Sequence, residues 1–149
     1  PMWQVPRIAA FLKALAAEAP PPPLFPGIPD LLRRLAGGGV TLAIASSNTE
    51  AQIRHSLGPE LAGLVAHLAV EASLFGKAGR FRRILAASGI PKGSALAIGD
   101  EVRDIEAARE AGILAGSVAW GYAWPWLLAA HQPDVLFHAP EEIAAMLRA

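Results

Sequence analysis

The stretch IGDEVRD, residues 98–104, ends a short apolar run with two carboxylates four positions apart. If a helix begins directly after Asp100, the side chain of Asp104 lies one turn further along the same helix face. Two like charges at that spacing repel each other, and a helix N-terminus or a divalent cation relieves the repulsion. Oxygen ligands of this kind suit Mg²⁺, which keeps several waters and shares oxygens with a substrate. The structural alternative is that Asp100 caps the helix, Glu101 is an acidic first-turn residue and Arg103 pairs with a nearby carboxylate.

A second group of polar side chains ends the apolar run VTLAIAS, residues 40–46, and continues beyond it. Ser46, Ser47 and Asn48 stand just before an expected helix, where free backbone N–H groups and the helix dipole favour an anion. A serine hydroxyl adds one more donor to a phosphate oxygen. The alternative is that the polar residues 46–49 simply cap the helix.

Lys77, in the stretch LFGKAGRF, is expected at the junction between a loop and a helix. An ammonium group in that place can neutralise a phosphate or hold a carboxylate in position, although a lone lysine is more often an ordinary surface residue. The three arginines that follow it, Arg80, Arg82 and Arg83, are expected to form a solvated face of the helix.

The order of elements brings these three groups to one edge of a sheet. Short apolar runs alternate with helical stretches along the chain, which predicts an α/β fold whose parallel sheet is covered on both faces. In such sheets ligands bind at the carboxyl ends of the strands. The expected strands are 40–46, 67–72, 94–100, 113–120 and 134–137, and the expected helices are 28–39, 49–58, 77–89, 100–112, 124–130 and 140–148.

Four consecutive prolines at 20–23 separate a short N-terminal piece from the rest of the chain. Residues 6–18 carry apolar side chains at helical spacing, and the prolines end that helix. Residues 24–149 are expected to form one α/β core. The uncharged stretch 113–130 approaches the length of a membrane span, but glycines and Pro125 interrupt it, so we expect a strand, a loop and a short helix there.

Composition limits the classes of partner. Hydrophobic residues make up 53% of the 149 residues, enough to bury a core. The 13 basic and 13 acidic side chains balance, so charge predicts neither a nucleic acid nor an anionic membrane as partner. The lack of cysteine excludes disulfides and thiolate metal sites and suits a cytoplasmic protein. No secretory signal is visible, and nothing in the sequence indicates an oligomeric state.

The order of these groups resembles the motif order of the haloacid dehalogenase-like superfamily. A hydroxyl follows a strand, a lysine comes next, and Gly-Asp with a second Asp four positions on comes last. The phosphoglycolate phosphatase-like branch is the most similar, on the stretches LFGKAGRF, IGDEVRDIEAAREAG and VAWGY. The resemblance runs from about Phe25 to the C-terminus. It implies a Rossmann-like, doubly wound parallel sheet, with residues 1–23 as the remnant of a helical cap. It also implies Mg²⁺-dependent hydrolysis of a small phosphorylated metabolite.

The resemblance gives each group a role. Asp100 is expected to bind the metal, while Asp104 supports the metal or holds Lys77. Lys77 and Ser46 are expected to take up charge on the phosphoryl group, with Ser47 as an alternative register. Further residues that the resemblance assigns are Asn48, which helps to orient the phosphate loop, and Trp120 and Tyr122, which either line the crevice or belong to the core.

The first motif of that family, Asp-x-Asp, is absent. In the family its first Asp attacks the phosphorus and forms an aspartyl-phosphate, and its second acts as general acid and base. None of the four aspartates of this chain is followed two residues later by another. The family's first strand lies between the strands that carry Ser46 and Asp100, so the edges of those strands are expected to be unpaired, unless the sheet rearranges or borrows a strand.

Two hypotheses follow from the absent motif. The chain is either a piece of such a phosphatase, inactive by itself because it lacks the nucleophile, or a non-catalytic domain of the same fold that binds phosphate, a metal or a partner. A dehalogenase relative handles no phosphoryl charge, so Lys77 together with GDEVRD favours phosphate chemistry.

Overall fold

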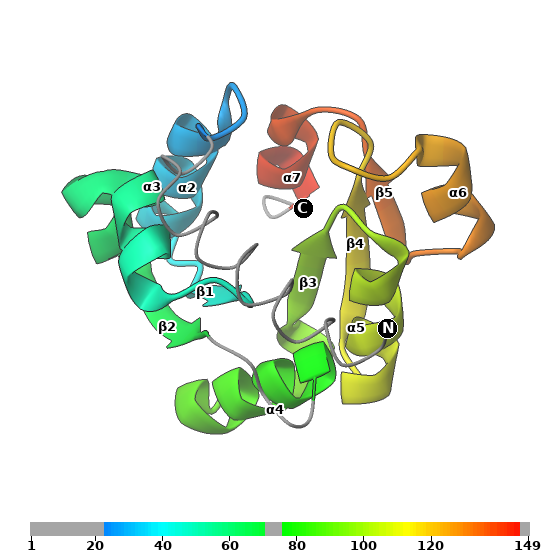
Figure 1. The fold of residues 1–149 in the computed structure, drawn as a ribbon, viewed down its shortest axis with the longest axis horizontal. Helices are drawn as coiled ribbons and strands as arrows, with labels where there is room; N and C mark the ends of the chain where they lie inside the picture. The colour runs from blue at the N-terminus through cyan, green and yellow to red at the C-terminus, as the bar shows by residue number, and fades with distance from the viewer. Residues whose placement is uncertain (1–22, 71–75, 147–149) are drawn as a thin grey trace, which may run out of the picture.

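A computed structural model of the chain describes residues 23–70 and 76–146. Strands and helices alternate along it (Figure 1), which confirms the predicted α/β fold. The helix expected at residues 6–18, and with it the expected cap remnant, lies outside the described residues. The strands are β1 (Leu42–Ala45), β2 (Val65–Ala69), β3 (Leu96–Gly99), β4 (Leu114–Val118) and β5 (Val135–Phe137). The helices are α2 (Ile28–Gly37), α3 (Glu50–Leu64), α4 (Gly76–Ser88), α5 (Val102–Ala111), α6 (Pro125–Ala130) and α7 (Pro140–Met146), with a short 3₁₀ turn at Lys92–Ser94.

The strands form two parallel sheets. β1 pairs with β2 in one, and β3, β4 and β5 follow one another in the other. Within the described residues no strand is hydrogen-bonded between β1 and β3, although the two sheets lie side by side in the body of the molecule (Figure 1). The expectation of unpaired edges on the strands that lead to Ser46 and Asp100 is therefore confirmed. The sheet has not rearranged so that these two edges pair with each other.

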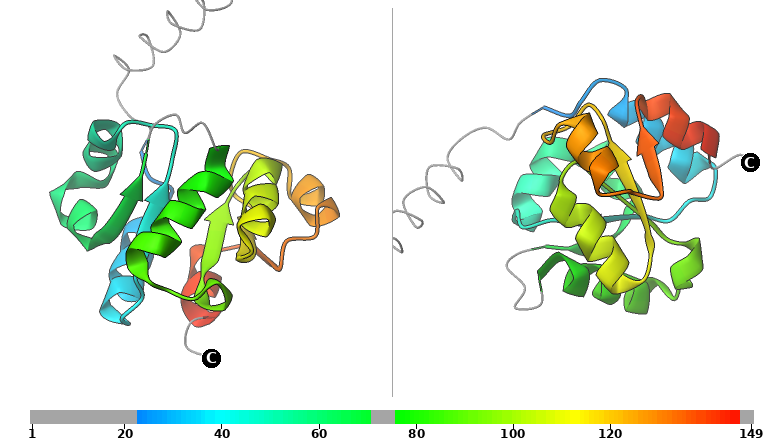
Figure 2. Two further views of the ribbon diagram at one scale, coloured as in Figure 1. Left: turned by 90° about the horizontal axis from the view of Figure 1, so that it is seen from below. Right: turned by 90° about the vertical axis from the view of Figure 1, so that its right-hand side faces the viewer.

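Two apolar clusters, on opposite faces of the strands, hold the sheets together. In Figure 1 and in the right-hand view of Figure 2, α2 and α7 lie above the strands and α4 lies below them. The upper cluster has buried side chains from α2, α7, β4 and β5, and both Leu42 of β1 and Leu96 of β3 pack against it. The lower cluster joins α5, α6 and β4, with Phe81 of α4 packed against it. α4 also contacts β1 and β2, so both sheets share a core on each face.

Helix α3 differs from its prediction, because it does not end at Gly58. Gly58 has a left-handed φ of 72°, and Pro59 then begins a second helical segment that reaches Leu64. A bidentate contact fixes this segment to α2, since the Arg33 guanidinium donates to both carboxylate oxygens of Glu60 at 2.7 and 3.1 Å. This contact holds the pKa of Glu60 below its usual range. Its small contribution to stability is therefore present at neutral pH and is lost as the pH falls through the lowered pKa.

The uncharged stretch 113–130 folds as the sequence predicts. It contains β4, a loop and the short helix α6. Across residues 23–70 and 76–146, the structure contains no helix with the length and apolar character needed to cross a bilayer.

Strand β4 buries one hydroxyl without a partner. Ser117 has no exposed surface, and its Oγ forms no hydrogen bond with any residue that the structure describes. A buried hydroxyl that lacks a partner loses its hydrogen bonds to water without compensation. Ala115, two residues earlier on β4, faces the same side of the strand and is equally buried. The two positions therefore form a matched pair.

We expect Ser117→Ala to raise the free energy of unfolding by about 1 kcal/mol, because it removes a desolvated hydroxyl. The reciprocal change, Ala115→Ser, should lower it by roughly 1–3 kcal/mol because it buries a new one. Urea denaturation monitored by circular dichroism measures both. A loss of stability in Ser117→Ala would contradict the assignment and show that Oγ has a partner.

Candidate functional site

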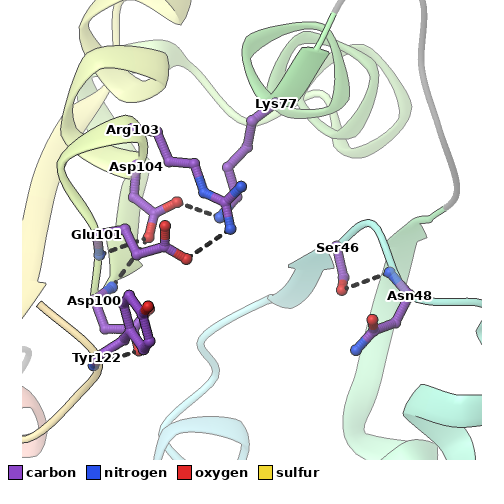
Figure 3. A network of polar contacts seen from close by, with 8 residues as sticks. All are labelled: Ser46, Asn48, Lys77, Asp100, Glu101, Arg103, Asp104 and Tyr122. Carbon is purple, nitrogen blue, oxygen red and sulfur yellow. Dashed lines mark hydrogen bonds and ion pairs between the residues drawn. The ribbon is translucent and has the colours of Figure 1, made fainter. Parts of the chain in front are cut away.

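The predicted site residues lie where β1 and β3 end and where α4 begins (Figure 3). The structure brings Lys77, Asp100 and Asp104 together in one bonded cluster. Ser46 and Asn48 follow β1 and face this cluster from the other side of the view in Figure 3. No hydrogen bond joins the two groups within the described residues, so the site consists of two halves, one at the end of each sheet.

The carboxylate of Asp104 is the centre of the bonded cluster. Its Oδ2 accepts the backbone N–H groups of Asp100 and Glu101, at 3.0 and 3.1 Å, and its Oδ1 accepts the ammonium of Lys77. The Asp104 side chain is only 5% exposed, so these bonds replace water around a buried charge. Asp104 therefore neutralises the N-terminus of α5 and fixes the ammonium of Lys77. The N-cap of α5 is Glu101, and the alternative that Asp100 is the cap is wrong.

Asp100 is held by the loop that follows β4. The backbone N–H of Tyr122 donates to Asp100 Oδ2 at 2.9 Å, and the N–H of Ala123 donates to the Asp100 carbonyl at 3.0 Å. In the part of the chain that the structure describes, Asp100 Oδ1 accepts no hydrogen bond. Asp100 thus presents one oriented oxygen that a cation can bind.

Two glycines make room for the two aspartates. A Cβ on Gly99 would overlap the carboxylate of Asp104, and a Cβ on Gly121 would overlap the side chain of Asp100. The φ of Gly99 is not in the left-handed region, so the requirement for glycine there is steric. The sequence places Gly121 directly after a strand, in the stretch VAWGY, but it gave this residue no role. The only local signal was its position directly after the strand and Trp120.

The first turn of α4 contributes Lys77, whose side chain is 28% exposed. Further along the helix, Arg82 pairs with Glu110 on the surface, and Arg83 is exposed, as predicted. The prediction is wrong for Arg80, which is buried. Arg80 lies three residues after Lys77 and therefore shares its inward helix face.

The turn after β1 has a cap of its own, independent of Ser46. Thr49 Oγ1 accepts the N–H of Gln52 at 3.3 Å, and the Gln52 side chain accepts the N–H of Thr49 at 3.0 Å, which forms a capping box. Ser46 Oγ accepts the N–H of Asn48 at 3.1 Å, so its own hydrogen remains available for donation. The hydroxyl of Ser46 is therefore not needed to cap α3. Ser47 is exposed beside it.

The aromatic residues after β4 separate into core and surface. Trp120 packs against the upper apolar cluster, whereas Tyr122 is 86% exposed. Trp124 and Trp126 are exposed as well. A hollow of about 300 Å³ lies along the loop from Ala119 to Pro125. Trp120 is thus mainly a core residue, and Tyr122 contributes its backbone N–H to the site.

The residues that could hold a metal are few. In the described ranges, 23–70 and 76–146, no group of three or more His, Asp or Glu side chains converges on one point. Mg²⁺ commonly binds through one or two carboxylates and completes its shell with water and substrate oxygens. The free oxygen of Asp100 fits this mode, while both oxygens of Asp104 already accept hydrogen bonds.

Comparison with known proteins identifies related chains. The family profile described as haloacid dehalogenase-like hydrolase matches residues 3–118. A phosphoglycolate phosphatase from Synechococcus elongatus is 31% identical over 143 residues, which cover 95% of this chain and 68% of that protein. A haloacid dehalogenase-like hydrolase structure from Streptococcus pneumoniae has a TM-score of 0.75 and 27% identity over 84% of this chain and 60% of that one. A D,D-heptose 1,7-bisphosphate phosphatase from B. bronchiseptica, complexed with magnesium and phosphate, has a TM-score of 0.67 and 19% identity over 83% of each chain. This chain therefore spans only about two thirds of some of its relatives.

We expect Gly99→Ala to lower the free energy of unfolding by about 2–4 kcal/mol, because the new methyl group displaces the carboxylate that binds the start of α5. Gly93→Ala is the matched control, since a Cβ at Gly93 meets no atom within 4 Å. It should change stability by less than about 0.5 kcal/mol. Urea denaturation of both variants provides the comparison, and equal effects would contradict the steric role of Gly99.

Proposed function

Because the chain belongs to the haloacid dehalogenase-like hydrolase family, we propose that it forms the phosphate- and metal-binding part of a phosphatase that acts on a small phosphorylated metabolite. The observation that carries this proposal is the cluster in which Asp104 holds the ammonium of Lys77 beside the oriented carboxylate of Asp100. A fixed cation and a free anionic oxygen at the carboxyl end of a parallel sheet suit the charge stabilisation that phosphoryl transfer needs.

Asp100 is the proposed metal ligand. Tyr122 orients its carboxylate through Oδ2, which leaves Oδ1 to bind Mg²⁺. Bound Mg²⁺ would neutralise charge on the phosphoryl oxygens. We assign Asp104 a supporting role at this metal, exerted through the backbone of Asp100 and through Lys77, because its own oxygens are occupied.

Ser46 and Lys77 are the proposed phosphate-binding groups, from the two halves of the site. Lys77 would place positive charge beside the equatorial oxygens of the transferred phosphoryl group, and Ser46 would donate a hydrogen bond to one of them. Because Asp104 holds the ammonium in place, it is already oriented before phosphate arrives. Ser47 and Asn48 lie in the same turn and would add further donors beside the N-terminus of α3.

The substrate class rests on the relatives. The Synechococcus elongatus protein is named a phosphoglycolate phosphatase, and the B. bronchiseptica structure contains magnesium and phosphate. We therefore propose a small phosphomonoester, of the phosphoglycolate type, hydrolysed in the cytoplasm. In the complete enzyme an Asp-x-Asp carboxylate would attack phosphorus, release the alcohol and be regenerated by water. The 149 residues contain no such pair, so we expect this chain to be inactive by itself.

The second candidate function is a non-catalytic domain that keeps the phosphate and metal site. This function requires no nucleophile, which agrees with the absence of Asp-x-Asp from the 149 residues. Both functions require that the site binds phosphate and Mg²⁺, and only the first requires a nucleophile. Binding and turnover therefore test different parts of the proposal.

The binding test is a calorimetric titration of the chain with inorganic phosphate in the presence and absence of Mg²⁺. We expect Lys77→Met to weaken phosphate binding by about tenfold or more, because it removes a charge-assisted hydrogen bond. Asp100→Asn should remove the dependence on Mg²⁺. Arg83→Met, on the exposed face of the same helix, is the control and should leave binding unchanged. If the parent chain binds no phosphate at any Mg²⁺ concentration, both candidate functions fail.

The turnover test begins with the coding region on the 5′ side of the Pro1 codon. If that region encodes an Asp-x-Asp strand in frame, we expect the encoded protein to hydrolyse phosphoglycolate with Mg²⁺. Asp100→Asn should then reduce kcat by about 100-fold or more. Near-normal turnover of Asp100→Asn would contradict its role as metal ligand. A stop codon in that region would favour the non-catalytic domain.

A further inference from the structure

We propose that Arg103 is a specificity-determining residue that binds a second anionic group of the substrate, a carboxylate on the alcohol part of the phosphomonoester. This inference rests on the proposed function and deepens it, because it assigns a residue of this chain to the recognition of that carboxylate. Three features of the molecule support it: the bond that holds Arg103, the charge of the helix end where it lies, and the direction of its side chain.

Arg103 is held by the residue that caps helix α5. Its Nη2 donates to Glu101 Oε1 at 2.6 Å. The N–H of Glu101 donates to the buried carboxylate of Asp104 at 3.1 Å, and Asp104 in turn holds the ammonium of Lys77. The two cations, Lys77 and Arg103, are therefore anchored to the same few residues at the start of α5. The guanidinium, like the ammonium, is oriented before any ligand arrives.

Helix stability does not explain an arginine at this position. Arg103 is the second residue of α5, and the free N–H groups of a first helical turn disfavour a basic side chain there. The side chain of Arg103 is 69% exposed, and an ion pair as exposed as the one with Glu101 contributes little to stability. A residue that opposes the local preference of its helix is expected where the residue serves in binding.

The side chain of Arg103 points into the candidate site. Figure 3 shows it extending from α5 toward the end of the Lys77 side chain, on the side of the bonded cluster that faces Ser46. Side chains two positions apart within a helix diverge, but Glu101 precedes the helix and has an extended backbone, so the two side chains can meet. The pair with Glu101 thus keeps the guanidinium at the end of α5 that faces the site.

The donors that remain on Arg103 match a planar anion. A guanidinium has five N–H donors, and within the described residues Arg103 forms only the bond to Glu101. The other donors can bind both oxygens of a carboxylate in parallel, which the point charge of an ammonium does not do. Lys77 therefore suits the phosphoryl oxygens and Arg103 suits the carboxylate. Because both cations lie at the start of α5, one small molecule can carry both anionic groups.

The test is a calorimetric titration of the 149-residue chain, with Mg²⁺ present, against two ligands of similar size. One is phosphoglycolate, and the other is ethyl phosphate, which has a methyl group in place of the carboxylate. We expect the parent chain to bind phosphoglycolate more tightly than ethyl phosphate by about fivefold or more. Arg103→Met should remove this difference by weakening the binding of phosphoglycolate, with the Kd of ethyl phosphate unchanged to within about twofold. Arg103→Lys keeps the charge without the planar fork and should retain part of the difference.

Arg54→Met is the matched control. Arg54 is an exposed arginine on α3 that pairs with Glu50 at 2.7 Å, so this variant removes an equal charge from a comparable ion pair. It should leave the Kd of each ligand and their ratio unchanged. Thermal denaturation checks that the variants fold like the parent chain, as expected for substitutions of exposed side chains.

Other outcomes overturn the proposal. Equal affinity of the parent chain for the two ligands would show that the carboxylate is not recognised, and the proposed function would stand. An equal loss of affinity for both ligands in Arg103→Met would make Arg103 a general phosphate-binding residue without a role in specificity. A preference for phosphoglycolate that survives in Arg103→Met would place recognition of the carboxylate elsewhere. If the parent chain binds neither ligand, the proposed function itself fails, and the role of Arg103 fails with it.

Discussion

The burial of one carboxylate, that of Asp104, determines the geometry of the whole candidate site. A charge that is 5% exposed is stable only if each oxygen finds a donor, and Asp104 finds three. Two of the donors are backbone N–H groups at the start of α5, and the third is the ammonium of Lys77 from α4. The same carboxylate thus sets the turn after β3, the position of Asp100 and the distance between two helices. Gly99 exists at its position because nothing larger fits beside that carboxylate.

The sequence predicted the kinds of elements because apolar periodicity and glycine or proline boundaries are local signals. Prediction from the sequence was wrong where a feature depends on contacts between distant segments of the chain. Gly58 was expected to end a helix, but Pro59 begins a second segment directly after it. Arg80 was expected in solvent, although its burial depends on how α4 packs against the strands and α5. The number and type of strands could be predicted, whereas the depth at which each side chain lies could not.

In the candidate site, too, the sequence predicted some features and not others. The sequence predicted which side chains meet at the site, because residues that follow parallel strands converge at one edge. These are Ser46, Lys77, Asp100 and Asp104. The hydrogen bonds of these side chains could not be predicted from the sequence. Nothing near Asp100 in the sequence indicates that the N–H of Tyr122 orients it or that Gly121 must be small, since those contacts join segments that are distant along the chain. The absence of Asp-x-Asp was visible in the sequence, and the resemblance predicted the gap in strand pairing that the structure confirms between β1 and β3 in the described residues.

The division into two sheets also has a consequence for how the molecule folds and opens. Each sheet comes from one continuous stretch of chain, 42–69 for the first and 96–137 for the second, so every strand pairing closes within its own stretch. Pairings of short range carry a low loop-closure cost and form early. Within the described residues no strand pairing joins the stretches, and they are connected through α4 on one face and through the contact of α2 with α7 on the other. The candidate site lies between the two sheets, where local opening breaks no strand-to-strand hydrogen bond of the described residues.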